Sequence, residues 1–314
     1  LYFPPVGVGF LFQLIHCPSL TLAATVGSML DPDKTARNTR RRQGKDHSPM
    51  TAAPWRNPRA PLVWRKIQEV RMQRKIGVIG GSGVYQIEGL QDAAWTAVET
   101  PWGATSDEIL TGTLGGVPMC FLPRHGRGHV HLPTEVPFRA NIDALKRLGC
   151  TDLIAVSAVG SLREDFAPGD MVVLDQFIDR TCARPASFFG EGCVAHVSLA
   201  DPVCAALSEA CARALQPTGA TVHRGGTYLA IEGPQFSTRA ESNLYRSWGC
   251  DVIGMTAMPE ARLAREAELC YASVAMVTDY DCWHEGHGAV DVAQVIAVLT
   301  RNAGTAKAMI AGLP

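Results

Sequence analysis

The chain has 314 residues, of which 46% are hydrophobic and 19% are charged, and its formal net charge is −1. This composition excludes a chain that is disordered throughout and leaves room for one large domain or two small ones. The charge is uneven, because Lys and Arg outnumber Asp and Glu in the first 75 residues and the remainder is acidic. An acidic main body disfavours nucleic-acid binding, and the contrast separates the first stretch from the rest.

Residues 1–71 differ from the rest of the chain. Residues 4–30 are apolar, but their stretches between Gly and Pro are too short for a membrane helix, and they lack the basic start of a signal peptide. Because the chain begins with Leu1 and Met72 stands just before the first clear strand, we expect residues 1–71 to be disordered or a non-native upstream extension. A targeting segment and a basic arm for nucleic acid, built on residues 40–42, are the alternatives.

The rest of the chain alternates apolar runs with amphipathic segments. Strands are predicted at residues 75–79, 108–114, 117–122, 152–156, 171–174, 226–231, 251–254 and 272–277, and helices at 141–148, 201–215, 240–248, 259–268 and 290–310. This order predicts that residues 72–314 form a single α/β domain, whose largely parallel or mixed sheet is covered on both faces by helices.

The cysteines show no pattern of a metal or redox site. The ten cysteines are scattered, without a C-x-x-C pair or a Cys/His cluster at metal-ligand spacing. We therefore expect reduced thiols, a cytoplasmic location and no metal.

Several predicted strand ends carry groups that suit a phosphate ion. They are Ser82 in the glycine-rich run 80–83, Arg124 with His125, the small residues from Ser157 through Ala158, and Thr256. Glycine lets the backbone approach an anion, and the arginine fork matches phosphate oxygens. Phe236, after the strand at 226–231, can stack on a base. Each motif taken alone is equally compatible with a tight turn, a solvated basic loop or core packing.

The run 272–277 leads into Asp279 and Asp281, which point the same way if the strand continues through them. Two carboxylates can accept hydrogen bonds from an amino-substituted ring, and one of them, if protonated, can donate a proton. A solvated turn with an Asx cap is the alternative. Together with the anion-binding loops, the pair suits phosphorolysis of a nucleoside.

Seven motifs, at residues 75–83, 124–126, 160–163, 175–181, 232–238, 255–256 and 278–283, resemble the 5′-methylthioadenosine phosphorylase branch of the trimeric purine nucleoside phosphorylase family. The resemblance implies a three-layer sandwich with a mixed central β-sheet flanked by helices, and a homotrimer with its sites near subunit interfaces. It implies phosphorolysis of 5′-methylthioadenosine to adenine and 5-methylthioribose 1-phosphate in methionine and purine salvage, with inorganic phosphate as co-substrate and no cofactor or metal. A broader purine nucleoside or methylthioinosine phosphorylase is the alternative. The family continues past Pro314, which leaves open whether residues 72–314 form the whole domain.

The resemblance also implies roles for single residues. The residues that would meet phosphate are Ser82, Arg124, His125, Ala158 and Thr256. Phe236 would pack on the base and Met255 on the ribose, while Asp279 would protonate or hydrogen-bond the purine N7 and Asp281 would bind the 6-amino group. His196 resembles the residue that a neighbouring subunit sends to the methylthio end.

The chemistry agrees with these roles. Cleavage of the glycosidic bond builds negative charge on the purine, and a buried Asp279 with a raised pKa can hold the proton that neutralises it. A carboxylate at Asp281 accepts from a 6-amino group and repels a 6-oxo group, which favours adenine.

Overall fold

The computed structural model describes residues 74–313, with the exception of 82, 191 and 288–291. The predictions made for residues 1–71 and for Ser82 therefore lie outside the described residues. The strands are β1 (Ile76–Gly80), β2 (Gln91–Thr96), β3 (Ile109–Leu114), β4 (Val117–Pro123), β5 (Asp152–Ser161), β6 (Met171–Val173), β7 (Gln176–Asp179), β8 (Val222–Arg224), β9 (Thr227–Ala230), β10 (Val252–Gly254) and β11 (Cys270–Asp279). The α-helices are α2 (Phe138–Arg147), α3 (Ala205–Leu215), α4 (Arg239–Ser247), α5 (Ala257–Glu266) and α6 (Val292–Ala311).

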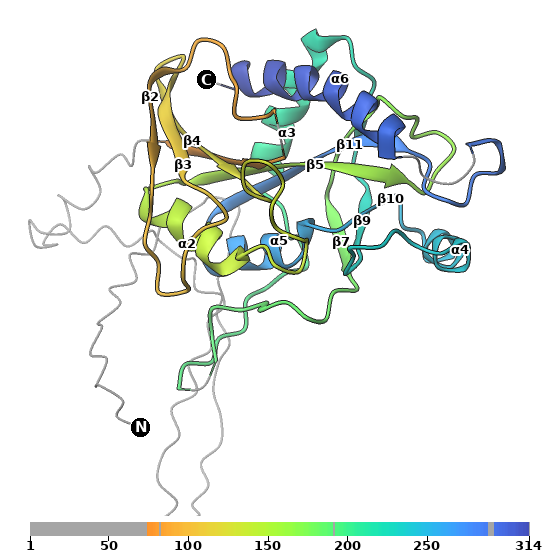
Figure 1. Cartoon of the computed structure of the whole chain (residues 1–314), viewed down its shortest axis with the longest axis horizontal. Coiled ribbons are helices and arrows are strands. Elements are labelled where there is room, and N and C mark those ends of the chain that lie inside the picture. The colour runs from red at the N-terminus through yellow and green to blue at the C-terminus, as the bar shows by residue number, and fades with distance from the viewer. Residues whose placement is uncertain (1–73, 82, 191, 288–291, 314) are drawn as a thin grey trace, which may run out of the picture. The chain divides into compact units, whose positions relative to one another are not determined.

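The strands form one mixed sheet between two layers of helices (Figure 1). Its main order is β2-β3-β4-β1-β5-β10-β9-β7, and β11 pairs with β5 and β6. Helices α3 and α6 lie over one face of the sheet, and α2 and α5 lie over the other. The predicted three-layer α/β sandwich with a mixed central sheet is therefore confirmed.

Four neighbouring strands share one direction. β1 is parallel to β4 and to β5, and β11 is parallel to β5, whereas β10 runs antiparallel to β5. The carboxyl ends of β4, β1, β5 and β11 consequently point to the same edge of the sheet. This is the edge at which ligands bind in α/β proteins.

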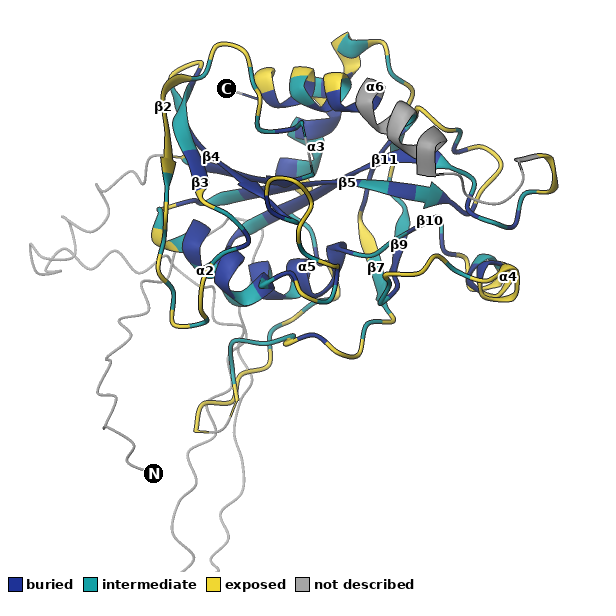
Figure 2. Ribbon diagram, in the orientation of Figure 1, coloured by how far each residue is buried: buried dark blue, intermediate teal, exposed yellow. Residues whose placement is uncertain are grey.

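The core lies on both faces of these central strands (Figure 2). All five residues of β1 are buried, and so are most residues of β5 and β11. Strands that are covered by helices on both faces need apolar side chains on both faces, which explains the continuous apolar runs in the sequence. On α3, Leu207, Cys211 and Leu215 recur at a spacing of four and form the buried face.

The predicted elements are all present, but three strands were missed, and β5 and β11 are both clearly longer than predicted. β2 is almost wholly exposed, and β7 and β8 have only four and three residues, so none carries a clear apolar pattern. β5 continues to Ser161 and β11 to Asp279, beyond the predicted ends at residues 156 and 277.

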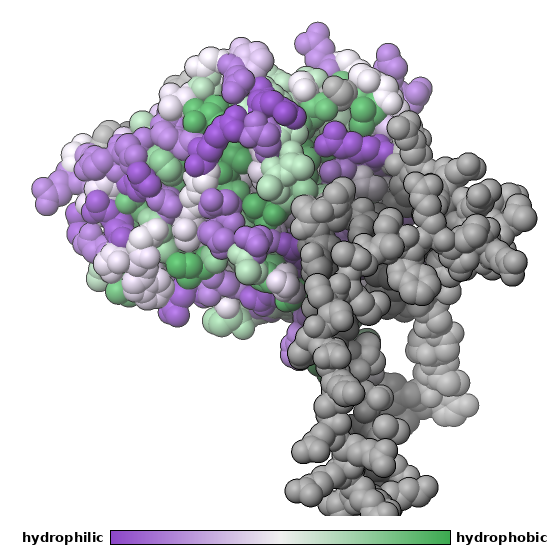
Figure 3. Space-filling model, turned by 180° about the vertical axis from the view of Figure 1, so that it is seen from behind, coloured by the Kyte–Doolittle hydropathy of each residue, from purple (hydrophilic) through white to green (hydrophobic). Residues whose placement is uncertain are grey.

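The surface is mixed in character. In the view from behind, hydrophilic residues are interspersed with small apolar patches (Figure 3), as is typical of a surface that faces water. Within the described part of the chain, no helix is long and apolar enough to cross a membrane.

Candidate active site

The β-ladder is interrupted beside β5. The last pair that joins β1 to β5 is Ile79 with Ala155, and β10 pairs with β5 only from Gly160 onward. β11 accompanies β5 on its other side over this whole length. Among the described strands, none pairs with the β1-facing edge of β5 between Ala155 and Gly160. We call this stretch of unpaired edge the ladder gap.

The ladder gap corrects one prediction. Ser157 and Ala158 were expected in an anion-binding loop after the strand at 152–156, but β5 continues through Ser161 and pairs with β11. Only the edge that faces β1 is open. Ala158 lies in the ladder gap, as its predicted role at a phosphate requires, yet it belongs to a strand.

The register places the predicted residues along the ladder gap in order. At one end, Arg124 donates to the carbonyl of Val156. The other end of the gap is Gly160, which pairs on its opposite edge with Asp279 of β11 and has the Asp279 carboxyl group lying against it. Gly160 is four positions after Val156, which is roughly 13 Å along the strand at about 3.3 Å per residue. This span can hold an anion, a pentose and a heterocycle in a row.

Asp279 ends β11 in a partly buried position. Its Oδ2 accepts from the Thr278 hydroxyl at 2.7 Å, and its Oδ1 accepts from the amide of Asp281 at 2.7 Å. Burial raises the pKa of Asp279 above its ordinary value, and these two hydrogen bonds offset the effect only in part. The carboxyl group is therefore more readily protonated than an exposed aspartate, as general-acid chemistry requires.

Asp281 stands two residues further on, in a backbone conformation with a φ of 53°. Its side chain is buried, and its Oδ2 accepts from the Ser237 hydroxyl at 2.7 Å. Both aspartates lie against Gly160, where an added Cβ would be 3.0 Å from Asp279 Oδ1 and 3.3 Å from the Asp281 Cβ. The predicted condition, a strand that continues through both residues, is not met, because β11 ends at Asp279. The Asx turn that the sequence left open is present in the bond from the Asp281 amide to Asp279 Oδ1, and both aspartates nevertheless lie against the same glycine.

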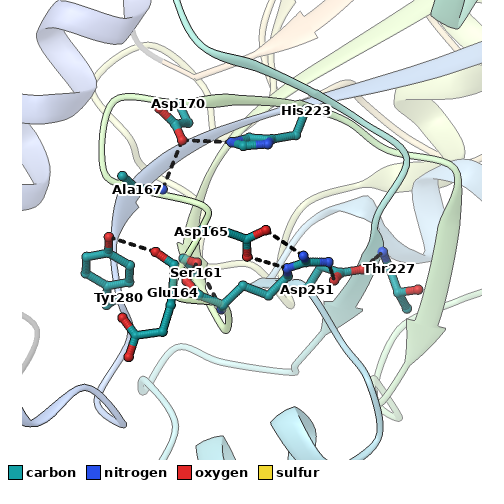
Figure 4. Close-up of polar contacts among 10 residues, drawn as sticks. Ser161, Glu164, Asp165, Ala167, Asp170, His223, Thr227, Asp251 and Tyr280 are labelled. Atoms are coloured by element: carbon teal, nitrogen blue, oxygen red, sulfur yellow. Dashed lines mark hydrogen bonds and ion pairs between the residues drawn. The ribbon is translucent and has the colours of Figure 1, made fainter.

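The segment after β5 supports the loop that carries Asp281 (Figure 4). The Tyr280 hydroxyl donates to the Glu164 carbonyl at 3.4 Å, and the Trp283 indole donates to the Ser161 carbonyl at 2.8 Å. Arg163 anchors this segment through Asp165 and Asp251, at 2.6 and 2.9 Å. Two loops that are far apart in the sequence are therefore tied together beside the aspartate pair.

Arg124 follows the end of β4 and is only 2% exposed. Its guanidinium donates to both carboxylate oxygens of Glu260, at 2.8 and 3.1 Å, and to the carbonyls of Val156 and Ile79, at 3.0 and 3.4 Å. The predicted position at the carboxyl edge of the sheet is confirmed. The solvated basic loop that the sequence left open is excluded, because the side chain is buried and paired.

His125 is neutral at physiological pH. Burial lowers the pKa of His125 to about 4. Its Nδ1 lies 2.9 Å from the carbonyl of His131, and since a carbonyl only accepts, Nδ1 carries the proton. Nε2 is then an acceptor. A neutral ring bonded in this way has no second N–H, and the predicted contact of His125 with phosphate stays a prediction.

The segment after β10 turns back toward the phosphate end of the ladder gap. Val252 pairs with Ser161 and Ile253 with Gly160, so the antiparallel chain continues toward Ala158 and Ser157. Met255 and Thr256 follow at once, and Thr256 is the N-cap residue of α5. Met255 also packs on Gly233, where φ is 70° and a Cβ would lie 2.5 Å from its Sδ.

Phe236 lies between β9 and α4 and is 49% exposed. Core packing is therefore excluded for this ring. The next residue, Ser237, is bonded to Asp281, which places the Phe236 segment beside the aspartate loop. An exposed ring at this point remains available to a planar ligand.

Arg184 connects the segments that follow β9 and β10. Its buried guanidinium donates to the carbonyls of Met255 and Met258, at 2.5 and 2.8 Å, and to that of Glu232 at 2.7 Å. It also donates to the Glu232 carboxylate at 2.9 Å. Met255 is thereby fixed relative to the segment that leads to Phe236.

His196 is not brought to the other predicted residues by any contact described for this chain. It is exposed in the segment between β7 and α3, which projects from the α5 side of the body (Figure 1). Its role at a neighbouring subunit stays a prediction. Within the described part of the chain, no three His, Cys, Asp or Glu side chains are grouped as metal ligands.

Sequence reasoning missed two residues of the site, Ser237 and Glu260. Ser237 was part of a quoted motif but had no assigned role. Glu260 was placed only inside a predicted helix, and its sole signal was a carboxylate beside the apolar residues Ala257, Met258 and Ala261.

Comparisons with known proteins agree with this geometry. The family model described as the phosphorylase superfamily matches residues 75–313. A curated protein of Cereibacter sphaeroides, S-methyl-5′-thioadenosine phosphorylase, is 72% identical over 243 residues, which cover 77% of this chain and 84% of the relative. The protein of the same name from Geobacter sulfurreducens is 62% identical over 240 residues, which cover 76% and 84%.

Solved structures are similar as well. A methylthioadenosine phosphorylase from an antarctic soil metagenomic library has a TM-score of 0.74 and 50% identity, with 77% of this chain and 86% of that chain covered. The methylthioadenosine phosphorylase from Schistosoma mansoni in complex with adenine has a TM-score of 0.71 and 38% identity, with 76% and 90% covered. The chain belongs to the phosphorylase superfamily and, within it, to the branch of the S-methyl-5′-thioadenosine phosphorylases.

Proposed function

We propose that this chain catalyses phosphorolysis of 5′-methylthioadenosine to adenine and 5-methylthioribose 1-phosphate. The observation that carries the proposal is the ladder gap. It has a fixed guanidinium, Arg124, at one end and a partly buried carboxyl group with a raised pKa, Asp279, beside the other. The names of the similar proteins support the same reaction.

Phosphate would bind at the Arg124 end. The ladder gap offers unpaired edge groups of β5 beside Ala158, and Thr256 approaches from the opposite side. An anion held here is oriented before the glycosidic bond breaks, which lowers the entropic part of the barrier. The sugar would then lie between this end and the aspartates, beside Met255.

The purine would bind at the Asp279 end. As the bond to C1′ breaks, the ribose becomes cationic and the purine becomes anionic. The proton on Asp279 moves to N7 and neutralises the leaving group, and phosphate then attacks C1′. Asp281 would accept from the 6-amino group, with its own orientation fixed by Ser237.

The assembly and location are also proposals. A homotrimer would bring His196 of one subunit to the site of the next, and the exposed position of His196 allows this. The nine described cysteines are free thiols, which is typical of the cytoplasm. The reaction requires phosphate as co-substrate and, as proposed, no cofactor.

A direct test is incubation of the pure protein with 5′-methylthioadenosine, with and without phosphate, followed by chromatography of the purine product. We expect free adenine only when phosphate is present, and a sugar phosphate in equal amount. Adenine release that does not depend on phosphate would indicate a hydrolase and would contradict the proposal.

A further inference from the structure

Glu260 is a buried carboxylate that the proposed reaction does not use. It lies in the first turn of α5, four residues after Thr256, and is 1% exposed. A charged group in such a position is costly unless it is paired and hydrogen-bonded. Glu260 is both, since Arg124 and Tyr271 donate to it.

The contacts of Glu260 fix the guanidinium of Arg124. Oε2 accepts from Nε at 2.8 Å, Oε1 accepts from Nη2 at 3.1 Å, and Oε1 also accepts from the Tyr271 hydroxyl at 3.0 Å. An arginine has five N–H donors in one plane. The Nε–H and one Nη2–H donate to Glu260. The other Nη2–H donates to the carbonyl of Ile79, and one Nη1–H donates to the carbonyl of Val156. One Nη1–H is left for a ligand, so its direction is set by the protein.

Glu260 also cancels the charge of Arg124. The two groups form a buried ion pair, with side chains that are each 2% exposed. The neighbouring ring of His125 is neutral, because burial lowers the pKa of His125 to about 4. The guanidinium end of the ladder gap therefore offers one directed donor without the net positive charge that a free arginine would bring.

A phosphate held in this way keeps its own negative charge. Hydrogen bonds from a neutralised ion pair position the ion, whereas an uncompensated cation would bind it more tightly and stabilise its charge in the ground state. In the proposed reaction, the charge of the phosphate must instead face the ribosyl cation in the transition state. Only interactions that are stronger in the transition state than in the ground state accelerate the chemical step.

We propose that Glu260 is a positioning residue of the phosphate subsite, which fixes the remaining donor of Arg124 and cancels its charge so that bound phosphate remains reactive toward C1′. This inference rests on the proposed function. It assigns to Glu260, and to Tyr271 behind it, a role that is separate from the binding of the nucleoside.

Three variants separate charge from geometry. Glu260→Gln keeps the size of the side chain and one acceptor oxygen toward Arg124 but removes the charge, and we expect the KM for phosphate to fall at least threefold while kcat falls about tenfold or more. Glu260→Asp keeps the charge but withdraws the carboxylate, and Tyr271→Phe removes one hydrogen bond. In both we expect the KM for phosphate to rise about threefold to tenfold. The KM for the nucleoside should stay within about twofold in all three.

A matched control is Leu215→Ala in α3, a fully buried side chain on the other face of the sheet. It lowers stability without touching the ladder gap, and its KM for phosphate should not change. If Glu260→Gln does not fold, Tyr271→Phe, which leaves the ion pair intact, carries the test. The inference is overturned if the KM values for phosphate and nucleoside move together, or if the phosphate KM of Glu260→Gln is unchanged or raised.

Direct titration of phosphate into the wild type and the variants keeps the two proposals apart. If the wild type binds phosphate but releases no adenine, the proposed function fails, and the affinities still test Glu260. Tighter phosphate binding by Glu260→Gln and weaker binding by Tyr271→Phe would then support the subsite by itself. Equal affinities in all variants would overturn the inference whatever the reaction is.

Discussion

Gly160 and Asp279 face each other across β5 and β11, and a Cβ added to Gly160 would lie 3.0 Å from Oδ1 of Asp279. The same Cβ would be 3.1 Å from Ile253 Cγ2. There is thus no room for a side chain on this part of β5 unless the aspartate moves. The missing side chain is what allows Asp279 to lie back against the strand.

The first prediction follows from this contact. In Gly160→Ala, Asp279 must shift by a few tenths of an ångström, and we expect kcat/KM to fall roughly tenfold because the proton donor is misplaced. Gly304→Ala is the control, since a Cβ there meets nothing within 4 Å. Steady-state kinetics with 5′-methylthioadenosine compare the two. Equal activity of both variants would show that the position of Asp279 is not critical.

The second prediction concerns the proton itself. Asp279→Ala removes the group whose pKa is raised by burial, and we expect turnover to fall at least about 10²-fold. In the wild type, the protonated form is lost as pH rises through the raised pKa, so the rate should decline with rising pH over that range. In the Asp279→Ala variant, the decline in rate over this pH range should be absent. Turnover close to that of the wild type would remove Asp279 as the acid.

The third prediction concerns the choice of purine. Asp281→Asn replaces one acceptor oxygen by a donor, which suits a 6-oxo group better than a 6-amino group. We expect the ratio of kcat/KM for 6-amino over 6-oxo nucleosides to fall about tenfold or more. Ser237→Ala removes the bond to Asp281 Oδ2 but keeps the carboxylate. Its ratio should change less, and an unchanged ratio in Asp281→Asn would refute the role.

The fourth prediction concerns stability and pH at Glu232. Burial opposes ionisation of this carboxyl group. Hydrogen bonds from the amides of Cys182 and Ala183 and from Arg184 outweigh that effect and lower the pKa of Glu232 from 4.5 to about 2. Because the folded-state pKa is depressed, the stabilisation is present above pH 4.5 and is lost as pH falls toward about 2. A shift of this size corresponds to about 3 kcal/mol.

Glu232→Gln should therefore lower the free energy of unfolding by about 2–3 kcal/mol at pH 7. The difference from the wild type should shrink as pH falls below about 4.5. Urea unfolding at several pH values measures this, with exposed Glu99→Gln as the control. A difference that does not depend on pH would mean that the side chain acts through packing rather than through its charge.

Local patterns were sufficient for much of the fold. The runs that became β1, β5 and β11 are apolar without interruption, because helices cover both of their faces. The sequence also predicted the strand ends that carry Arg124 and Asp279, because in each case the polar residue comes after an apolar run that forms a buried strand. The family prediction, which rested on the order of seven motifs, is confirmed.

Contacts between distant segments were not predictable in this way. The length of β5 depends on β11, which pairs with it as far as Gly160, and Ser157–Ser161 has too many small residues to be recognised as a strand alone. Glu260 is 136 residues from Arg124 in the sequence, and Ser237 is 44 from Asp281. No local period or spacing connects such pairs.

The amino-acid sequence by itself determined the α/β class, the order of most elements, and the residue types that stand at the carboxyl ends of the strands. Burial and backbone preference act over a few residues, and they leave a readable pattern. Only the tertiary structure decided that β1 ends early beside β5, that the His125 ring is bonded to the carbonyl of His131, and that the charge of Arg124 is cancelled by Glu260. These properties depend on which groups meet after the chain has folded, and hydrogen-bond partners, desolvation and net local charge do not exist before that point.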